Sequence, residues 1–339
     1  MKNITKIVLG VIVTGAAGLF GLARAADVPP EVRVAYSGGS QVLVLAKADG
    51  SLEKALGTHV KWVQFASGAD VLNLFAANAI DIANFGSSPA VASIVRKLPV
   101  QIVGVSGVIA TYERLIARKN IQSLKDLEGK TVGYPPNSTS QYALEAAIKV
   151  NHLDRTRIKL VPLRPAELVA AYRRGDIDAG YLWAPFTQQL EDDGGHQLFA
   201  TQQLQKDGYL IYNNYVVRTA FAKQYPDVVA HFLAVHQQKV NEYRADPEKA
   251  ANLVAKELEA PVSTSKNTLA GLEYPSLAEQ ATQRWLGDGS NPENSGIAQA
   301  VKKTAQFLAE SGQISDDSVP ASVGGAINGS FAKQAAGQH

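Results

Sequence analysis

The stretch Ile82-Ala83-Asn84-Phe85-Gly86-Ser87-Ser88-Pro89 joins a short apolar run to two hydroxyl residues and a proline. A short apolar run that ends at a glycine is typical of a buried strand, and a proline after hydroxyl residues is typical of a helix start. We therefore expect a strand over residues 81–85 and a helix over 89–96, with Ser88 as the N-cap. A strand that leads directly into a helix is the building unit of an α/β fold.

The same alternation extends to both sides of this stretch. In the first unit, strands are expected over 32–36, 60–65 and 100–105, and helices over 41–56 and 69–77 with Ser67 as an N-cap. In the second unit, strands are expected over 115–117, 131–134, 158–161 and 177–183, and helices over 140–151 and 165–174. The remainder is expected to be chiefly helical, over 221–225, 227–244, 247–257 and 294–311, with a frayed tail over 330–339. This pattern predicts two α/β units, each around a mostly parallel sheet.

The second unit weakly repeats the first. Asn78-Ala79-Ile80-Asp81 precedes one expected strand, and Gly175-Asp176-Ile177-Asp178 precedes another. After each strand comes a proline, Pro89 in the first unit and Pro185 in the second, although the register differs by one residue. We interpret this similarity as suggestive of an internal repeat.

Composition and charge exclude several classes of protein. The 339 residues include 33 Lys and Arg against 31 Asp and Glu, so the formal charge of +2 gives no basis for nucleic-acid binding. The length suggests about two domain-sized units. The absence of cysteine excludes disulfide scaffolds, thiolate metal sites, cysteine nucleophiles and a lipid anchor attached to cysteine.

The first 26 residues differ from the rest of the chain. Lys2 and Lys6 precede an apolar run over 7–22, and Ala23-Arg24-Ala25 fits the small-x-small cleavage pattern. We expect a secretory signal peptide over residues 1–25, cleaved near Ala25. The alternative is a transmembrane anchor, but the run is diluted by Gly and Ala and is short for a span of ~20 residues.

The sequence contains no recognisable catalytic constellation. Its six histidines are scattered, and the close pair His231 and His236 is spaced i to i+5, so the two rings do not share a helix face. A nucleophile elbow, a Walker loop and a dinucleotide fingerprint are all missing from the sequence. We therefore expect no catalytic residues, no metal site and no cofactor, and we interpret Asp176 and Asp178 as turn residues.

Hydroxyl residues at helix starts are the remaining candidates for chemistry. Gly86-Ser87-Ser88 offers N–H groups and hydroxyls where a strand ends, and Ser138-Thr139-Ser140 repeats this arrangement in the second unit. Each set is also compatible with a plain N-cap. Two such sets at the carboxyl ends of strands fit a small oxyanion bound in a crevice.

Several segments together resemble the solute-binding proteins of bacterial ABC importers, in the branch that serves taurine and aliphatic sulfonates. The longer matches are IANFGSSP at 82–89, SLKDLEGKTV at 123–132, RGDIDAGYLWAP at 174–185 and TAQFLAESG at 304–312, with shorter ones at 34–36, 65–68, 138–142 and 215–218. Any one of these segments alone is weak, but the set extends over nearly the whole chain after residue 26.

The resemblance implies a type II periplasmic binding protein fold, with two α/β lobes joined by two crossing strands. Lobe one would comprise residues 26–112 and 218–339, and lobe two residues 113–217, with hinge crossings near 113–117 and 213–217. A small organosulfonate would bind in the cleft, and lobe closure would present a new surface to an inner-membrane ABC permease. The protein is thus expected to be a periplasmic monomer that binds no nucleic acid.

The resemblance also implies which residues contact the ligand. The matches to Ser87 and Ser88 hold the sulfonate, the match to Trp183 lines the cleft, and Glu113 matches one of two carboxylates that hold an ammonium group. The second carboxylate falls at Asn213. The expected ligand-binding residues are Gln41, Gly86, Ser87, Ser88, Glu113, Ser138, Thr139, Ser140, Trp183 and Asn213.

Asn213 departs from the pattern of the taurine binders. An amide in place of a carboxylate removes a charge-assisted hydrogen bond of ~1.5–3 kcal/mol to an ammonium group. Glu113 could still bind a cation, pair with Arg114 or be solvated. Other ligands therefore stay open: a bulkier or aromatic sulfonate, for which tyrosines 209, 212 and 215 could line a larger cleft, or a nitrate-like or pyrimidine-like molecule.

Two other classes of protein with the same fold stay open as well. Some enzymes resemble it, including a chorismate dehydratase of menaquinone synthesis and a pyrimidine synthase of thiamine synthesis. The expected signal peptide argues against such cytoplasmic enzymes, and the synthase would need a cysteine-rich motif that this chain lacks. A ligand sensor that docks to a membrane receptor would have the same cleft as a transport protein.

Overall fold

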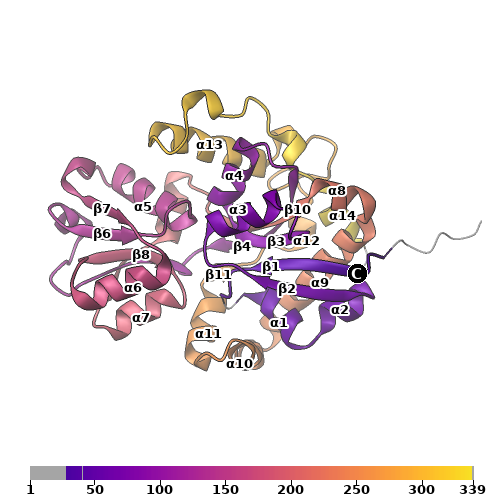
Figure 1. Cartoon of the computed structure of the whole chain (residues 1–339), viewed down its shortest axis with the longest axis horizontal. Helices are drawn as coiled ribbons and strands as arrows, with labels where there is room; N and C mark the ends of the chain where they lie inside the picture. Colours follow the sequence, from indigo (N-terminus) through magenta and orange to yellow (C-terminus); the bar gives the residue numbers. More distant parts are fainter. Residues whose placement is uncertain (1–27, 40, 338–339) are drawn as a thin grey trace, which may run out of the picture.

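Residues 28–39 and 41–337 are described by the computed structural model, shown in Figure 1. The expected signal peptide over residues 1–25 lies outside the described residues. Within the described part, no helix is long and apolar enough to cross a membrane.

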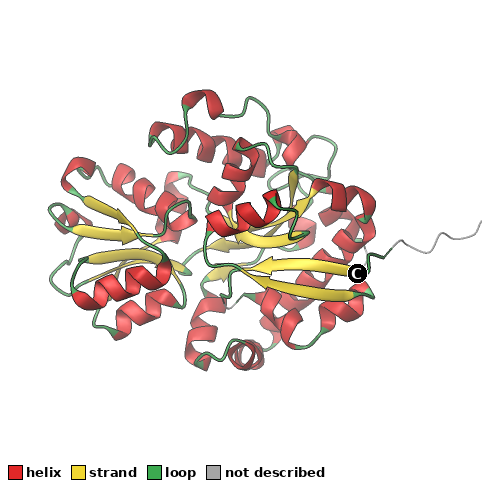
Figure 2. Ribbon diagram, viewed as in Figure 1, coloured by secondary structure: helices red, strands yellow, loops and turns green. Residues whose placement is uncertain are grey.

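Two mixed sheets lie side by side, each flanked by helices (Figure 2). The first sheet has the strand order β11 (Leu272–Glu273), β4 (Val100–Ile109), β10 (Tyr212–Arg218), β3 (Ile82–Gly86), β1 (Glu31–Tyr36), β2 (His59–Gln64). The second has the order β7 (Lys159–Pro162), β6 (Thr131–Tyr134), β8 (Ala179–Trp183), β5 (Glu113–Ala117), β9 (His196–Ala200). We use lobe one for the first sheet with its helices, and lobe two for the second.

The helices follow the strands in chain order. Lobe one begins with α1 (Val42–Ala48), α2 (Ser51–Leu56), α3 (Gly68–Ala76) and α4 (Ser87–Val95). Lobe two contains α5 (Thr139–Val150), α6 (Pro165–Arg174) and α7 (Phe186–Asp192). After β10 the chain forms α8 (Thr219–Gln224), α9 (Pro226–Ala245), α10 (Pro247–Glu257), α11 (Val262–Ala270), α12 (Leu277–Gln280), α13 (Gly296–Glu310) and α14 (Ser330–Ala336).

The two sheets share one topology. β1 pairs in parallel with β2 and β3, and β6 pairs in parallel with β7 and β8. An antiparallel strand from elsewhere in the chain then lies beside the third strand, β10 beside β3 and β5 beside β8. This arrangement agrees with the internal repeat that the sequence suggested, and it brings β3–α4 and β8–α7 to equivalent places.

The chain passes between the lobes twice. Residues 110–112 connect β4 of lobe one to β5 of lobe two, and residues 201–211 lead from β9 back to β10 in lobe one. Helix α13 also reaches both lobes, because it packs on α4 while Phe307 stacks edge-on against Tyr142 of α5 at 4.8 Å between ring centroids. Lys149 of α5 pairs with Glu310 at the end of α13 at 2.8 Å.

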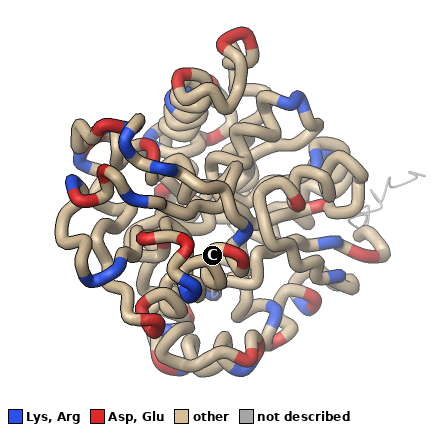
Figure 3. The backbone as a smooth tube through the Cα atoms, turned by 60° about the vertical axis from the view of Figure 1, so that its left-hand side comes forward, with Lys and Arg blue, Asp and Glu red and all other residues tan. Residues whose placement is uncertain are grey.

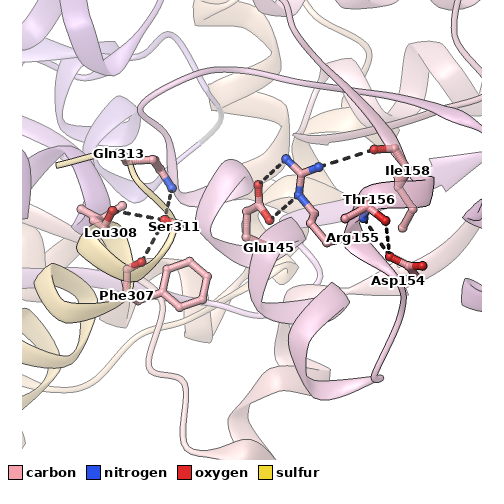
Figure 4. A network of polar contacts seen from close by, with 9 residues as sticks. All are labelled: Glu145, Asp154, Arg155, Thr156, Ile158, Phe307, Leu308, Ser311 and Gln313. Carbon is pink, nitrogen blue, oxygen red and sulfur yellow. Dashed lines mark hydrogen bonds and ion pairs between the residues drawn. The ribbon is translucent and has the colours of Figure 1, made fainter. Parts of the chain in front are cut away.

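Figure 4 shows two clusters of side-chain hydrogen bonds, one at the C-terminal end of α13 and one on α5 of lobe two. The Ser311 hydroxyl donates to the Phe307 carbonyl at 2.8 Å and accepts from the Gln313 amide at 2.9 Å. Arg155 donates from Nε to Glu145 of α5 at 3.0 Å. Both clusters lie at the surface, where such pairs contribute about 0–1 kcal/mol each.

Three local expectations were wrong. The helix expected over 41–56 is two helices, since Gly50 takes a left-handed φ of 66° that interrupts the hydrogen-bond ladder. Ser88 is not an N-cap, because α4 begins at Ser87 after Gly86 and takes Pro89 into its first turn, where a missing N–H costs nothing. The tail is not frayed over 330–336, because Phe331 and its neighbours pack α14 against α9.

Charged positions of both signs are interspersed over the chain in Figure 3. This distribution fits the near-neutral formal charge of +2.

Candidate functional site

A cavity of about 50 Å³ lies between the two lobes, at the carboxyl ends of β3 and β8. Its wall includes the starts of three helices: Ser67 and Gly68 for α3, Gly86 and Pro89 for α4, and Ser138 and Thr139 for α5. Each helix start carries a partial positive charge and N–H groups without helical partners. The three starts together therefore favour a bound anion.

Glu113 supplies the charge of the cavity wall. It is the first residue of β5 and lies opposite Trp183 of β8 in the sheet. Its side chain is 2% exposed, and its Oε1 accepts a hydrogen bond from the Thr139 hydroxyl. Its Oε2 has no hydrogen-bond partner among the residues that the structure describes. An acceptor oxygen is therefore left for a ligand.

Burial raises the pKa of the Glu113 carboxyl from 4.5 to about 7, and the hydroxyls of Thr139 and Ser140 offset part of this rise. The pKa rises because the charged form loses its hydration in the closed cavity. Within the described ranges, no Lys or Arg belongs to the cavity wall to oppose this effect. A cationic group on the ligand would therefore favour the ionised carboxylate.

Two amide side chains add further polar groups without partners. Asn213 of β10 lies opposite Gly86 of β3, is 4% exposed, and leaves its Nδ2 without an acceptor among the described residues. Gln41, just before α1, leaves its Oε1 without a donor in the same part of the chain. Buried polar groups without partners cost about 1–3 kcal/mol each, so a ligand that satisfies them gains affinity.

The lobes touch one another around this cavity. An added Cβ on Gly86 of lobe one would lie 2.6 Å from Cγ2 of Thr139 in lobe two. An added Cβ on Gly68 would lie 2.4 Å from the Asn137 carbonyl oxygen across the cleft. Arg164 of lobe two also pairs with Asp70 of lobe one at 3.0 Å. The structure is therefore a closed form, in which glycines allow the close approach.

Comparison with known proteins identifies the class. Residues 30–258 match the family described as the substrate-binding domain of ABC-type glycine betaine transport systems. The chain is also 32% identical over 291 residues to the taurine-binding periplasmic protein of Escherichia coli (strain K12). This alignment covers 84% of this chain and 87% of the Escherichia coli protein. The chain belongs to the family of these ABC-type substrate-binding domains. It is a substrate-binding protein of an ABC-type transport system.

Solved structures confirm the fold. The alkanesulfonate-binding protein SsuA from Xanthomonas axonopodis pv. citri, bound to MOPS, superposes with a TM-score of 0.71 at 20% identity, covering 90% of this chain and 98% of that one. The desulfurization enzyme DszB superposes with a TM-score of 0.61 at 14% identity, covering 91% and 99%. The expected periplasmic binding protein fold is therefore confirmed, and this fold carries binding proteins as well as an enzyme.

In this substrate-binding protein, the cavity brings together seven of the ten residues expected from the sequence. They come from both lobes and are Gln41, Gly86, Glu113, Ser138, Thr139, Trp183 and Asn213. Trp183 contributes an apolar surface and stacks edge-on against Phe186 at 6.3 Å. The remaining three, Ser87, Ser88 and Ser140, are fully buried beside the wall but are not among its lining residues.

The three serines outside the wall have separate surroundings. The Ser87 hydroxyl accepts from the Tyr212 N–H at 3.5 Å. Ser88 lines a second cavity of about 60 Å³ between α4 and the end of α13, and its hydroxyl has no partner among the described residues. Ser140 lies close enough to Glu113 to lower the pKa of its carboxyl.

The tyrosines of the return segment do not enlarge the cleft. Tyr212 and Tyr215 are fully buried in the core of lobe one, where the Tyr215 hydroxyl and Nδ1 of His236 share a hydrogen bond of 2.8 Å. Tyr209 packs against Phe307 at 6.3 Å between ring centroids. Of the roles that the sequence left open for these tyrosines, the structure therefore shows packing within the protein and no larger cleft.

Eight residues of the wall were not expected from the sequence. They are Ser37, Phe65, Ala66, Ser67, Gly68, Phe85, Pro89 and Tyr112. The sequence carries one sign that Ser67 and Gly68 belong to the wall: they open a helix after a strand, as Gly86 and Ser87 do. From the sequence, Ser67 is expected as an N-cap alone. Phe85 and Tyr112 adjoin the expected residues Gly86 and Glu113. Among the described residues, no group of three or more His, Asp or Glu side chains could hold a metal ion.

Proposed function

We propose that the protein binds a small organosulfonate between its lobes and delivers it, unchanged, to an ABC permease. The observation that carries this proposal is the convergence of three helix starts from both lobes on a cavity without Lys or Arg among its described lining residues. Helix starts and hydroxyls bind the tetrahedral oxygens of an anion through directed hydrogen bonds. The taurine-binding and alkanesulfonate-binding relatives support this choice of anion.

A small zwitterion with one sulfonate and one ammonium group suits the cavity best. The cavity volume of about 50 Å³ holds on the order of four water molecules. This size favours a ligand of a few heavy atoms over an aromatic sulfonate. The free Oε2 of Glu113 is placed to accept from the ammonium group. The free Nδ2 of Asn213 is a donor, which cannot accept from an ammonium group, so recognition of the amine rests on Glu113.

Export and closure complete the proposed cycle. We propose that residues 1–25 direct the chain to the periplasm and are removed near Ala25. We propose that the mature protein is a monomer. The hinge was expected near 113–117 and 213–217, but these residues belong to β5 and β10. We propose instead that the adjoining connections at 110–112 and 201–211 act as the hinge, since they are the places where the chain passes between the sheets. Ligand binding shifts the population toward the closed form, because only that form contacts the ligand from both lobes.

Calorimetry on protein that has been unfolded and refolded, to strip carried-over ligand, tests the proposed function. The titrants are taurine, ethanesulfonate, glycine betaine, nitrate and sulfate. We expect sulfonates to bind in the micromolar range or better, with no chemical change of the ligand after long incubation. Binding of every sulfonate weaker than millimolar, or conversion of the ligand, would contradict the proposal.

Truncation of the hydroxyls at the start of α4 tests how this helix contacts the anion. We expect Ser87→Ala, at the first position of α4 next to the wall residue Gly86, to weaken taurine binding by about 1 kcal/mol, since it removes a donor to an anionic oxygen. Ser88→Ala should leave the affinity nearly unchanged, because the Ser88 hydroxyl lies in the second cavity. The melting temperature should stay nearly unchanged, and Ser93→Ala, further along α4, is the matched control. A loss of stability without a loss of affinity in Ser87→Ala would assign Ser87 a purely structural role, and a loss of affinity in Ser88→Ala would mean that Ser88 contacts the ligand after all.

A further inference from the structure

The Glu113 carboxylate faces the cavity among neutral groups. Of the described residues that line the cavity, it is the one that carries a charge. Its nearest titratable neighbours are Tyr112, which precedes it, and Tyr181 of β8. Burial raises the pKa of both phenols well above 10, so both stay neutral at ordinary pH. No fixed cation within the described wall therefore sets the charge of Glu113.

Charged groups on the other elements that pack against β5 face elsewhere. Arg114 follows Glu113 on β5 and points to the other face of the sheet, where it pairs with Glu191 of α7 at 2.5 Å. His196 of β9 lies opposite Ala117, at the far end of β5. Glu145 of α5 pairs with Arg155 at the outer surface (Figure 4).

We propose that the protonation state of Glu113 selects the charge type of the ligand: the ionised carboxylate binds a zwitterion that carries an ammonium group, and the protonated carboxyl admits an anion that has none. This inference rests on the sulfonate function proposed above. It makes Glu113 a specificity-determining group whose preference changes with pH.

Electrostatics in the closed cavity gives the reason. An anion without a cationic group would place two negative charges in one small, dry space, and the carboxyl avoids this by taking up a proton. An ammonium group at Oε2 instead stabilises the ionised carboxylate. The pKa of about 7 that burial gives the Glu113 carboxyl lies between the values expected for these two complexes. A bound anion should raise the pKa further, and a bound zwitterion should lower it.

The sign of the pH dependence follows from this order. Between about pH 5 and pH 7, the complex with a simple alkanesulfonate holds one proton more than the complex with an aminosulfonate. Raising the pH therefore weakens alkanesulfonate binding relative to aminosulfonate binding, by up to about tenfold per pH unit. The ligand-free protein is common to both reactions, so its own protonation and its degree of opening cancel from the ratio.

The experiment measures the Kd of taurine and of ethanesulfonate at pH 5, 6 and 7 by calorimetry, in two buffers of different ionisation enthalpy. We expect the ratio of the ethanesulfonate Kd to the taurine Kd to rise about 100-fold from pH 5 to pH 7. Ethanesulfonate should take up close to one proton more than taurine does at pH 6. The paired buffers count these protons directly.

Two variants assign the effect to Glu113. In Glu113→Gln the Kd ratio should no longer change with pH, whereas Glu191→Gln, on the other face of β5, should keep the wild-type pH dependence. A wild-type ratio that stays constant from pH 5 to pH 7, with both ligands bound, would overturn the inference and leave the sulfonate function standing. Binding of neither ligand at any pH would overturn the sulfonate function itself, and this inference with it.

Discussion

Gly86→Ala is expected to weaken ligand binding by about 10- to 100-fold while leaving each lobe folded. The added methyl group would lie 2.6 Å from Cγ2 of Thr139, on the opposite lobe, so the closed form could not keep its present geometry. Overpacking of this kind costs about 1–3 kcal/mol, and about 2.7 kcal/mol corresponds to 100-fold in Kd. Within lobe one, Gly86 has an ordinary extended φ of −68° that alanine adopts without strain.

The measurements separate blocked closure from loss of folding. Calorimetry gives the Kd, solution scattering with and without ligand gives the degree of closure, and thermal unfolding gives the stability. Gly325→Ala is the matched control, because an added Cβ there meets nothing within 4 Å. The second variant, Gly68→Ala, should also oppose closure, since its methyl group would lie 2.4 Å from the Asn137 carbonyl oxygen, but it should lower the stability as well, because the methyl group would lie 2.9 Å from Cβ of Pro89 within lobe one.

A compensating change makes the prediction sharper. Thr139→Ser removes Cγ2, the atom nearest to the added methyl group, and keeps the hydroxyl that donates to Glu113. The double variant Gly86→Ala/Thr139→Ser should therefore recover a large part of the lost affinity, whereas two unrelated defects would add. Wild-type affinity in Gly86→Ala alone would mean that the lobes need not approach this closely around the ligand.

Local patterns in the sequence predicted the strand and helix units well, because each unit carries its own periodicity and end signals. The segment 165–174 and the strand over 131–134 form as expected. The prediction of a frayed tail was wrong for a non-local reason. Helix α14 forms because it packs on α9, which lies about a hundred residues earlier in the chain. A short polar segment carries no sign of such a distant partner.

The site was predictable only in part for the same reason. Ser37 at the end of β1 and Phe65 after β2 meet the cavity because parallel strands bring their carboxyl ends to one edge of the sheet. The sequence shows that such an edge exists, but not which side chains point into it. Conversely, Ser88 follows Gly86 by two residues, yet the turn into α4 directs it toward a different cavity.

Asn213→Asp is expected to convert the site toward aminosulfonates. Asn213 lines the cavity and is 4% exposed, and its Nδ2 has no partner among the described residues. An aspartate there would add a second carboxylate to the cavity that Glu113 lines and could accept from a ligand ammonium group. A charge-assisted contact of this kind should strengthen taurine binding relative to ethanesulfonate by about 1–2 kcal/mol.

Ethanesulfonate should lose affinity in the same variant for two reasons. The new charge repels the sulfonate in a cavity that already holds Glu113, and ethanesulfonate brings no cation to offset the two carboxylates. Measuring both ligands on both proteins at pH 7 gives a double difference from which a general loss of stability largely cancels. Asn213→Ala removes the amide without adding charge, so it should weaken both ligands similarly.

The double difference also decides which part of the ligand Asn213 faces. If Asn213 lies beside the ammonium group, Asp strengthens taurine binding outright, because the new carboxylate meets a cation. If it lies beside the sulfonate, Asp weakens both ligands by a similar factor and the double difference is near zero. In that case Glu113 alone recognises the amine, and specificity for aminosulfonates depends on its single carboxylate, which the pH dependence of the Kd ratio measures independently.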